Sequence, residues 1–153
     1  MKFLELKIPP VLLILIFAAI MWSISKNHPP LITGEDIRVW LLVSALLIAV
    51  SLTLAGALAF KQAQTTVDPT SPESTSALVT TGIYRYTRNP MYVGFFIALI
   101  GWGIFLGNAY ATLFALIFIP YMNRFQIQPE EQMLTKLFGQ QYTDYCQQVR
   151  RWC

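Results

Sequence analysis

Charged side chains are scarce in this chain. Asp, Glu, Lys and Arg make up 12% of its 153 residues, whereas they make up about 25% of an average soluble protein. None of them, and no histidine, lies within the apolar stretches 8–25, 39–60, 90–106 and 109–123. Hydrophobic residues reach 55%. The composition therefore predicts a membrane protein, and the lack of ionisable groups in the apolar stretches counts against proton-coupled transport, which depends on such groups.

Metal ligands are scarce as well. His28 is the single histidine, and the two cysteines are Cys146 and Cys153. A zinc or haem site inside a membrane requires paired His or Cys ligands, and the apolar stretches carry no such pair. No metal site is therefore predicted.

The apolar stretches predict the fold class, an all-α integral membrane protein with four transmembrane helices. A spanning helix needs roughly 20 mostly apolar residues, and residues 8–25 and 39–60 fall in that range. Residues 90–106 and 109–123 are shorter and lie close together in the sequence, so they are predicted to form a tight helical hairpin. The whole chain, 1–153, is predicted to be a single membrane domain.

Lysine and arginine are distributed unequally between the two ends of these spans. In a four-span arrangement one side carries Lys2, Lys7, Lys61, Arg85, Arg88, Arg124, Lys136, Arg150 and Arg151. The other side carries only Lys26 and Arg38. Because basic residues collect on the cytoplasmic side, both termini are predicted to be cytoplasmic, in the inner membrane of a bacterium. The positive net charge follows from this topology and does not support nucleic-acid binding. The cysteines fall on the reducing side, where a disulfide is not expected.

The cytoplasmic connection 61–89 has two unlike halves. Residues 65–76, TTVDPTSPESTS, have the composition of a linker, whereas residues 82–89, GIYRYTRN, crowd aromatic and basic side chains together. Connections of this length are typically functional or partly disordered. Because proline favours the first position of a helix, Asn89 is the predicted N-cap and Pro90 the first residue of the third span.

An amphipathic helix at about 129–150 is predicted after the hairpin. Its start carries Glu130 and Glu131, which suit the positive end of a helix dipole. Apolar residues then recur at helical spacing, namely Leu134, Leu137, Phe138, Tyr142, Tyr145, Val149 and Trp152. The polar residues between them are Lys136, Gln140, Asp144, Gln147 and Arg151. The helix is expected either along the cytoplasmic membrane surface or over the cytoplasmic end of the bundle, and both placements remain open.

Polar residues concentrate at the cytoplasmic ends of the third and fourth spans. Arg85, Arg88 and Asn89 precede the hairpin, and Asn123, Arg124, Glu130 and Glu131 follow it. Because a hairpin brings its own two ends together, these groups are expected to meet. Simpler explanations remain open for each part taken alone. The arginines suit positive-inside anchors, the acids suit dipole partners, and the glycines of the third span suit close helix packing.

The second half of the chain carries a two-part pattern. The stretch GIYRYTRNPMYVGFFIALIGWGIFLGN is followed by NRFQIQPEEQMLTKLFGQQYTDYCQQVRRW. It resembles the isoprenylcysteine carboxyl methyltransferase and phospholipid N-methyltransferase superfamily. In that family an Arg-His-Pro-x-Tyr-x-Gly segment opens one membrane helix and a Glu-Glu pair follows the next. The resemblance covers roughly residues 78–152, and the first two spans match only as generic hydrophobic helices.

This resemblance implies S-adenosylmethionine as methyl donor, bound between the last two spans and the C-terminal segment. The residues that it assigns to the cofactor are Asn89, Pro90, Tyr92, Gly94, Gly101, Gly103, Glu130 and Glu131, and its candidate catalytic residues are Arg88 and Asn89. Asn89 departs from the family pattern, in which histidine stands. Asparagine keeps a hydrogen-bond donor and an acceptor but carries no proton at neutral pH. A general-base role is therefore not expected there, whereas a role in positioning the cofactor survives.

Roles for these residues follow from the chemistry of the donor. Transfer of a methyl group from a sulfonium needs alignment and desolvation more than an acid. Glu130 or Glu131 is expected to hold the ammonium or the ribose hydroxyls of the donor. Arg88 or Arg85 is expected to pair with its carboxylate or with an anionic acceptor, and Tyr92 with its sulfonium.

The expected function is methyl transfer to a lipophilic acceptor at the cytoplasmic face of the membrane. The soluble donor would enter from the cytoplasm and the apolar acceptor from the membrane lipid. A carboxylate such as that of a prenylated cysteine, a lipid amine and a small thiol all remain open as acceptors. The alternative is a small four-span transporter or a structural membrane subunit without catalysis.

Overall fold

The computed structural model of the chain describes residues 5–27, 34–64 and 77–153. Within these ranges every regular element is a helix, which confirms the predicted all-α class. The predictions made for His28 and for the linker-like residues 65–76 fall outside the described ranges.

The apolar segments form helices whose ends differ by a few residues from the predicted spans. Their bounds are α1 Pro10–Lys26, α2 Glu35–Gln62, α3 Pro90–Phe105, α4 Ala109–Ala115 and α5 Phe118–Met122. α2 is longer than predicted because acidic residues in its first turn and Lys61 in its last turn suit the helix dipole. The other elements are the short 3-10 helix η3 Gly82–Arg85, the π-helix η4 Asn123–Ile127, α6 Gln128–Phe138 and α7 Gln140–Gln148.

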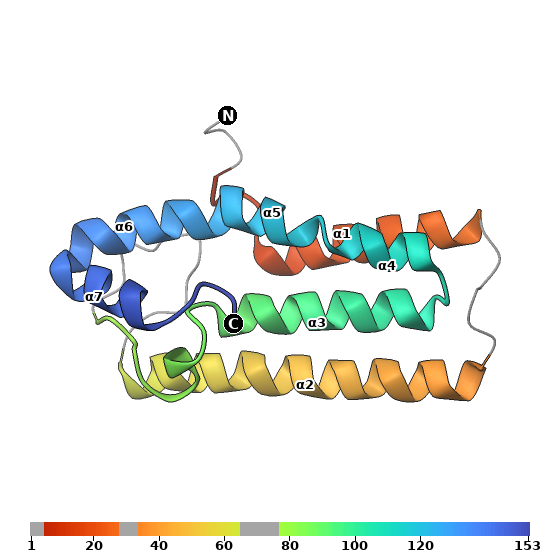
Figure 1. The fold of residues 1–153 in the computed structure, drawn as a ribbon, viewed down its shortest axis with the longest axis horizontal. Helices are drawn as coiled ribbons and strands as arrows, with labels where there is room; N and C mark the ends of the chain where they lie inside the picture. The colour runs from red at the N-terminus through yellow and green to blue at the C-terminus, as the bar shows by residue number, and fades with distance from the viewer. Residues whose placement is uncertain (1–4, 28–33, 65–76) are drawn as a thin grey trace.

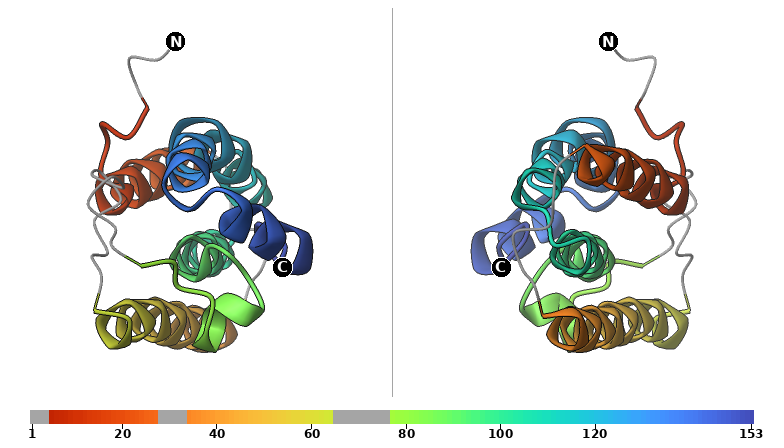
Figure 2. Two further views of the ribbon diagram at one scale, coloured as in Figure 1. Left: turned by 90° about the vertical axis from the view of Figure 1, so that its left-hand side faces the viewer. Right: turned by 90° about the vertical axis from the view of Figure 1, so that its right-hand side faces the viewer.

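Successive long helices run in opposite directions, and α3 lies at the centre of the bundle (Figure 1). Both end-on views place α3 between α2 on one side and α1 with α4 on the other (Figure 2). The core around α3 consists of Leu13, Phe17, Met21, Tyr92, Leu99, Ala111, Ala115, Phe118, Met122 and Ile127. The start of α1, the end of α2, the start of α3 and the end of α5 all lie at one end of the bundle, where α6, α7 and η3 gather (Figure 1).

Glycines of α3 allow its neighbours to approach closely. A Cβ atom at Gly94 would lie 2.8 Å from the carbonyl oxygen of Ala49 in α2, and one at Gly101 would overlap Ala45 of the same helix. A Cβ atom at Gly103 would lie 2.6 Å from the hydroxyl oxygen of Thr112 in α4. These glycines therefore face helix neighbours, as residues in close helix–helix contacts of membrane proteins do.

The predicted fourth span, 109–123, is divided between α4 and α5. Pro120 has no N–H and so cannot donate to the carbonyl of Leu116. The Ile119 N–H donates to that carbonyl instead at 3.3 Å, which tightens the turn. After α5 the helical path continues without a loop, through the π-helix η4 directly into α6.

The predicted C-terminal helix, 129–150, is also divided, into α6 and α7. Gly139 separates them with φ at 53°, a left-handed conformation that glycine adopts without steric cost. The break folds α7 back, and it packs with the end of α2 and the segment around η3 in a second cluster. The buried members of that cluster are Ala59, Val79, Tyr84, Tyr142, Tyr145 and Val149. α7 therefore lies over the end of the bundle, which is one of the two placements that the sequence left open.

Among the described residues, α2 is the one helix both long and apolar enough to cross a membrane, while α1 and α3 are apolar but shorter. The outer faces of the bundle are nevertheless rich in exposed apolar side chains. Trp40 is 70% exposed, Leu47 64% and Leu15 61%. Soluble monomers rarely expose large contiguous apolar patches.

Candidate active site

The segment that enters α3 is fixed by a local turn. Asn89 occupies the N-cap position and Pro90 begins the helix, as predicted. The Asn89 side chain makes no capping bond, and its Nδ2 donates to the carbonyl oxygen of Arg151 at 2.9 Å. The buried Thr87 supports the turn, since its hydroxyl accepts from the Asn89 N–H at 3.2 Å and donates to the same Arg151 carbonyl at 3.3 Å.

Glu131 lies between two arginines from opposite sides of the site. Its Oε1 is 3.0 Å from Arg88 Nη2. Arg151 approaches the same carboxylate with both prongs of its guanidinium, Nε to Oε1 at 3.0 Å and Nη2 to Oε2 at 2.6 Å. Bidentate pairs of this kind fix geometry as well as charge. One carboxylate facing two guanidiniums leaves the cluster with one surplus positive charge.

Glu130 stands beside this cluster in a different environment. Its Oε1 accepts a hydrogen bond from the Tyr92 hydroxyl at 2.5 Å, which joins α6 to the first turn of α3. Burial raises the pKa of the Glu130 carboxyl to about 8, although the Tyr92 hydrogen bond lowers it and the neighbouring Glu131 charge adds to the rise. A carboxyl with this pKa is mostly protonated at neutral pH and ionises readily when a cation comes close.

The last residues of the chain run alongside the entry to α3. The Arg88 N–H donates to the Arg150 carbonyl at 3.1 Å. Two positions on, the Trp152 indole N–H donates to the Asn123 side-chain oxygen at 2.9 Å. The tail therefore connects the start of α3 with the end of the α4–α5 segment, and Figure 1 shows the C-terminus beside the start of α3.

Three tyrosines form the cover between α7 and η3. Burial raises the pKa of Tyr84, Tyr142 and Tyr145 above the usual range of a phenol. Their hydroxyls therefore stay protonated and can donate, as Tyr145 does to the Tyr84 carbonyl at 2.7 Å. This cover ties α7 to the loop that carries the Arg88 segment.

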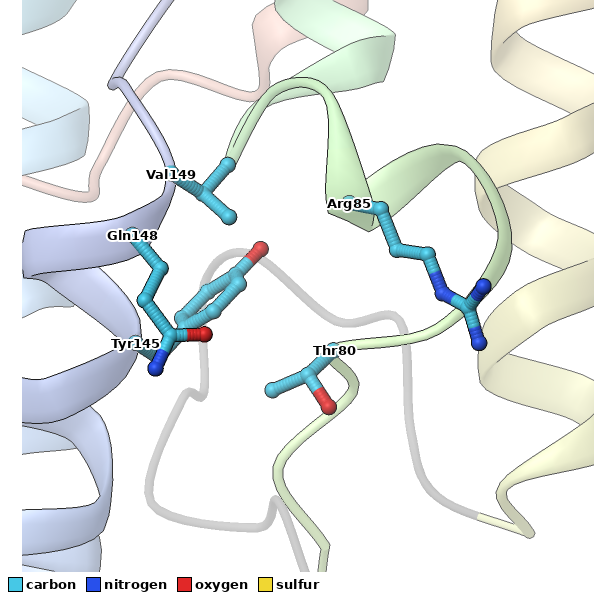
Figure 3. Close-up of a pocket in the computed structure, with 5 residues that line it drawn as sticks. All are labelled: Thr80, Arg85, Tyr145, Gln148 and Val149. Atoms are coloured by element: carbon cyan, nitrogen blue, oxygen red, sulfur yellow. The ribbon is translucent and has the colours of Figure 1, made fainter.

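Arg85 lies apart from the acidic pair. It is exposed and lines a separate open pocket of about 370 Å³ together with Thr80, Tyr145, Gln148 and Val149. Figure 3 shows this pocket between α7 and the segment around η3. Of the two arginines considered for an anion, Arg88 is thus the one beside Glu131.

A comparison with known protein families matches the part of the chain that carries Arg88, Glu130 and Glu131. The sequence model described as phospholipid methyltransferase matches residues 37–141. The chain belongs to the phospholipid methyltransferase family. The predicted resemblance to this superfamily is therefore confirmed, and the match covers most of α2 and the whole of α3 through α6.

Individual relatives of this family member agree with that assignment. A protein-S-isoprenylcysteine O-methyltransferase of Schizosaccharomyces pombe is 44% identical over 73 residues, 47% of this chain and 30% of the relative. One from Tribolium castaneum is 46% identical over 81 residues, 50% of this chain and 27% of the relative. An uncharacterized protein of Haemophilus influenzae is 45% identical over 62 residues, 40% of this chain and 98% of that protein. The chain thus matches less than a third of the length of these two named relatives.

The structure of this family member brings most of the predicted polar residues together. Arg88 meets Glu131, Tyr92 meets Glu130, and Asn89 contacts the tail beside them. Pro90 is buried at the start of α3 and sets the position of the turn. The expectation that the two ends of the hairpin carry mutually contacting groups is therefore confirmed for these pairs.

The predicted glycines are placed differently. Gly94 lies one turn into α3, whereas Gly101 and Gly103 lie near its opposite end, eleven and thirteen residues after Pro90. At about 1.5 Å per residue, that distance is about 16–20 Å along the helix. All three face neighbouring helices. Their assignment to the cofactor stays a prediction, and what their surroundings display is close packing.

Asn123 was among the polar groups expected at this end of the hairpin, whereas sequence reasoning missed Thr87, Arg151 and Trp152 as parts of the site. Arg151 was assigned to the polar face of a continuous amphipathic helix and Trp152 to its apolar stripe. Because α7 ends at Gln148, both residues instead turn back toward α3. No signal in the sequence points to Arg151, because the predicted cluster already contained Arg85 and Arg88 for its two acids.

Proposed function

We propose that this protein transfers a methyl group from S-adenosylmethionine to a lipophilic acceptor at the cytoplasmic face of a membrane. The observation that carries the proposal is the hydrogen-bonded cluster of Arg88, Tyr92, Glu130 and Glu131, all within the segment matched by the methyltransferase family. The family match favours this function over a transporter or a structural subunit. The named relatives are protein-S-isoprenylcysteine O-methyltransferases, which supports a lipidated or lipid-like acceptor.

The polar groups of the cluster fit the charges of S-adenosylmethionine. Among the described residues, the Nε atoms of Arg88 and Arg38 are both buried without a hydrogen-bond partner. A buried donor left unpaired is costly, and the Arg88 Nε, whose side chain pairs with Glu131, suits a ligand oxygen such as that of the donor's carboxylate. Glu131 is taken up by two guanidiniums, which leaves Glu130 as the acid able to accept the donor's ammonium or ribose hydroxyls.

The residues of the chain then act by binding, orientation and exclusion of water. Arg88 and Asn89 hold the amino-acid end of the donor at the entry to α3. Glu130 ionises as a cation approaches, and the Tyr92 hydroxyl stabilises that carboxylate through their hydrogen bond. α7 and its tyrosines cover the cluster and reduce its contact with water, which strengthens each charge interaction within it.

When bound, S-adenosylmethionine would supply an electrophilic methyl group to the acceptor's lone pair, and its sulfur would leave as a neutral thioether that the protein would not need to protonate. Alignment of the acceptor with the methyl group is then the main demand on the site. No residue needs to act as a general base for a carboxylate or thiolate acceptor, which agrees with asparagine at position 89.

The membrane arrangement that accompanies this function has four spans, formed by α1, by α2, by α3 and by the divided α4–α5 segment. Exposed apolar side chains around the bundle support contact with lipid. The excess of Lys and Arg at the end that carries α6 and α7 supports a cytoplasmic position for both termini. The site then lies where a soluble donor and a membrane-borne acceptor can meet, in the inner membrane of a bacterium.

A transfer assay tests this function and separates the acceptor classes. The purified protein in phospholipid nanodiscs is incubated with S-adenosylmethionine that carries a labelled methyl group. Separate reactions contain a bacterial lipid extract, a prenylated cysteine and an apolar thiol. Label moving into one organic-soluble product is expected, at a rate lost in Glu130→Ala. No transfer to any acceptor by protein that melts cooperatively would contradict the proposal.

A further inference from the structure

We propose that Arg151 is a positioning residue of the donor site: by holding Glu131, it leaves the charge of Arg88 available for a carboxylate. This inference rests on the proposed function. Arg151 lies outside the segment 37–141 that the family model matches, and it contributes to the site only because the chain turns back after α7. It acts through Glu131 and Arg88 and not by contact with the donor.

The geometry of the three side chains carries this inference. Arg151 engages both oxygens of Glu131, whereas Arg88 reaches only Oε1. Glu131 Oε2 therefore pairs with Arg151, at 2.6 Å, and Oε1 is shared between the two guanidiniums. Arg88 has only part of a counter-ion, and its Nε lacks a partner within the described residues. Without Arg151, the whole charge of Glu131 would fall to Arg88.

The backbone of the tail places Arg151 for this purpose. The Arg151 carbonyl accepts from the Asn89 amide and the Thr87 hydroxyl, and the Arg150 carbonyl accepts from the Arg88 N–H. Trp152 anchors the far side through Asn123. The tail is thus held at Arg150 and Arg151 by the segment that carries Arg88, and at Trp152 by Asn123. These contacts bring the Arg151 guanidinium to Glu131 in a fixed orientation.

The neighbouring Arg150 provides a matched control. It has the same charge and lies in the same tail, but its residue is exposed and only its backbone carbonyl bonds to the site. Arg150→Ala removes one positive charge without removing the carbonyl contact. Any effect of overall charge or of tail composition will therefore appear in both variants, whereas the pairing with Glu131 is lost only in Arg151→Ala.

The test compares two ligands that differ by one carboxylate. Calorimetry measures the Kd of S-adenosylmethionine and of decarboxylated S-adenosylmethionine for the full-length protein, Arg151→Ala, Arg151→Lys and Arg150→Ala. Loss of one charge-assisted contact is expected to weaken S-adenosylmethionine binding about 10-fold in Arg151→Ala. Its affinity for the decarboxylated ligand should stay unchanged. Arg151→Lys keeps the charge without the bidentate geometry and should recover part of the loss, while Arg150→Ala should match the unmodified protein.

The outcomes separate this inference from the function on which it rests. If the unmodified protein binds no S-adenosylmethionine, the proposed function fails and this inference falls with it. If that protein binds it and Arg151→Ala weakens both ligands equally, or neither, the role of Arg151 is overturned while the function stands. Thermal melting checks the fold of each variant. Should Arg151→Ala fail to fold, the same comparison is made with Arg151→Lys. If the ratio of its Kd values for the two ligands equals that of the unmodified protein, the role of Arg151 is overturned.

Discussion

Two arginines with nearly equal exposure stand at opposite ends of α3. The side chain of Arg38 is 13% exposed and that of Arg88 is 12% exposed, yet their partners differ. Arg38 donates to the carbonyl oxygen of Phe105 at 3.2 Å and lies 3.8 Å from Glu35, whose side chain is 88% exposed. Arg88 meets Glu131, whose side chain is 19% exposed.

The difference shows what each end of the helix requires. At the Phe105 end one cation serves the negative end of the helix dipole, and its pairing with an exposed acid on the same helix contributes little. At the Pro90 end two arginines, two glutamates and Tyr92 come from the segment before α3, from α3 itself, from α6 and from the tail. Capping α3 does not need this arrangement, and the excess of polar groups is why we propose the active site at this end.

Replacing each arginine by alanine gives the largest contrast. Arg88→Ala removes the proposed carboxylate partner and leaves Glu131 with one cation, so S-adenosylmethionine affinity is expected to fall about 100-fold. Arg38→Ala removes only a helix-end contact, which costs about 1 kcal/mol of stability, and should leave the affinity unchanged. Calorimetry and thermal melting of both variants measure this. Equal losses of affinity at the two ends would remove the distinction between them.

The pH dependence of donor binding sharpens the role of Glu130. A cation binds the ionised carboxyl, and below a pKa of about 8 the ionised fraction rises about 10-fold per pH unit. Affinity for S-adenosylmethionine should therefore rise with pH from 6 toward 8. Glu130→Gln cannot ionise and should show weak, pH-independent binding. If the affinity of the unmodified protein does not change over this pH range, a group other than Glu130 binds the donor's cation.

The stability of the fold should also depend on pH through Glu130, but it should fall with rising pH where donor binding rises. The pKa of Glu130 is raised in the folded protein from an ordinary 4.5 to about 8. A raised pKa stabilises the fold fully below 4.5, and this stabilisation is lost as the pH rises through 8. The melting temperature of the ligand-free protein should fall over that interval, and it should fall less in Glu130→Gln. Parallel melting curves for the two proteins would exclude a buried acid at this position.

The smallest expected effect concerns the glycine-packed end of α3. A methyl group at Gly101 meets Ala45 of α2, so Gly101→Ala should destabilise the protein by about 1–3 kcal/mol. The packing interpretation predicts an unchanged Kd for S-adenosylmethionine, whereas the predicted cofactor role requires a weaker one. Gly34→Ala is the matched control, because its Cβ meets only Ile37 at an ordinary 3.5 Å.

Prediction from the sequence succeeded where local pattern determines structure. Pro90 set the start of α3, and the two-part motif placed Glu130 and Glu131 near Arg88 and Tyr92. It failed where a single backbone conformation redirects the chain. Helical spacing continues through Gly139 in the sequence, so the periodicity predicted one helix, and only the left-handed conformation of Gly139 separates α6 from α7.

The position of the tail was beyond sequence reasoning for a related reason. Arg151 reaches Glu131 because backbone carbonyls of the tail bond to Thr87, Arg88 and Asn89, more than 60 residues earlier. No local spacing encodes a contact of this kind. The same holds for Arg124, which was expected among the site residues and instead pairs with Glu5 at 2.9 Å.

One titration tests the central claim most directly. S-adenosylmethionine is titrated calorimetrically into the full-length protein in detergent, with Arg88→Ala and Arg38→Ala measured alongside. We predict saturable binding at one site per chain that Arg88→Ala weakens and Arg38→Ala leaves intact. A well-folded protein that takes up no S-adenosylmethionine, or one whose binding is unaffected by Arg88→Ala, would contradict the assignment of the active site to the Pro90 end of α3.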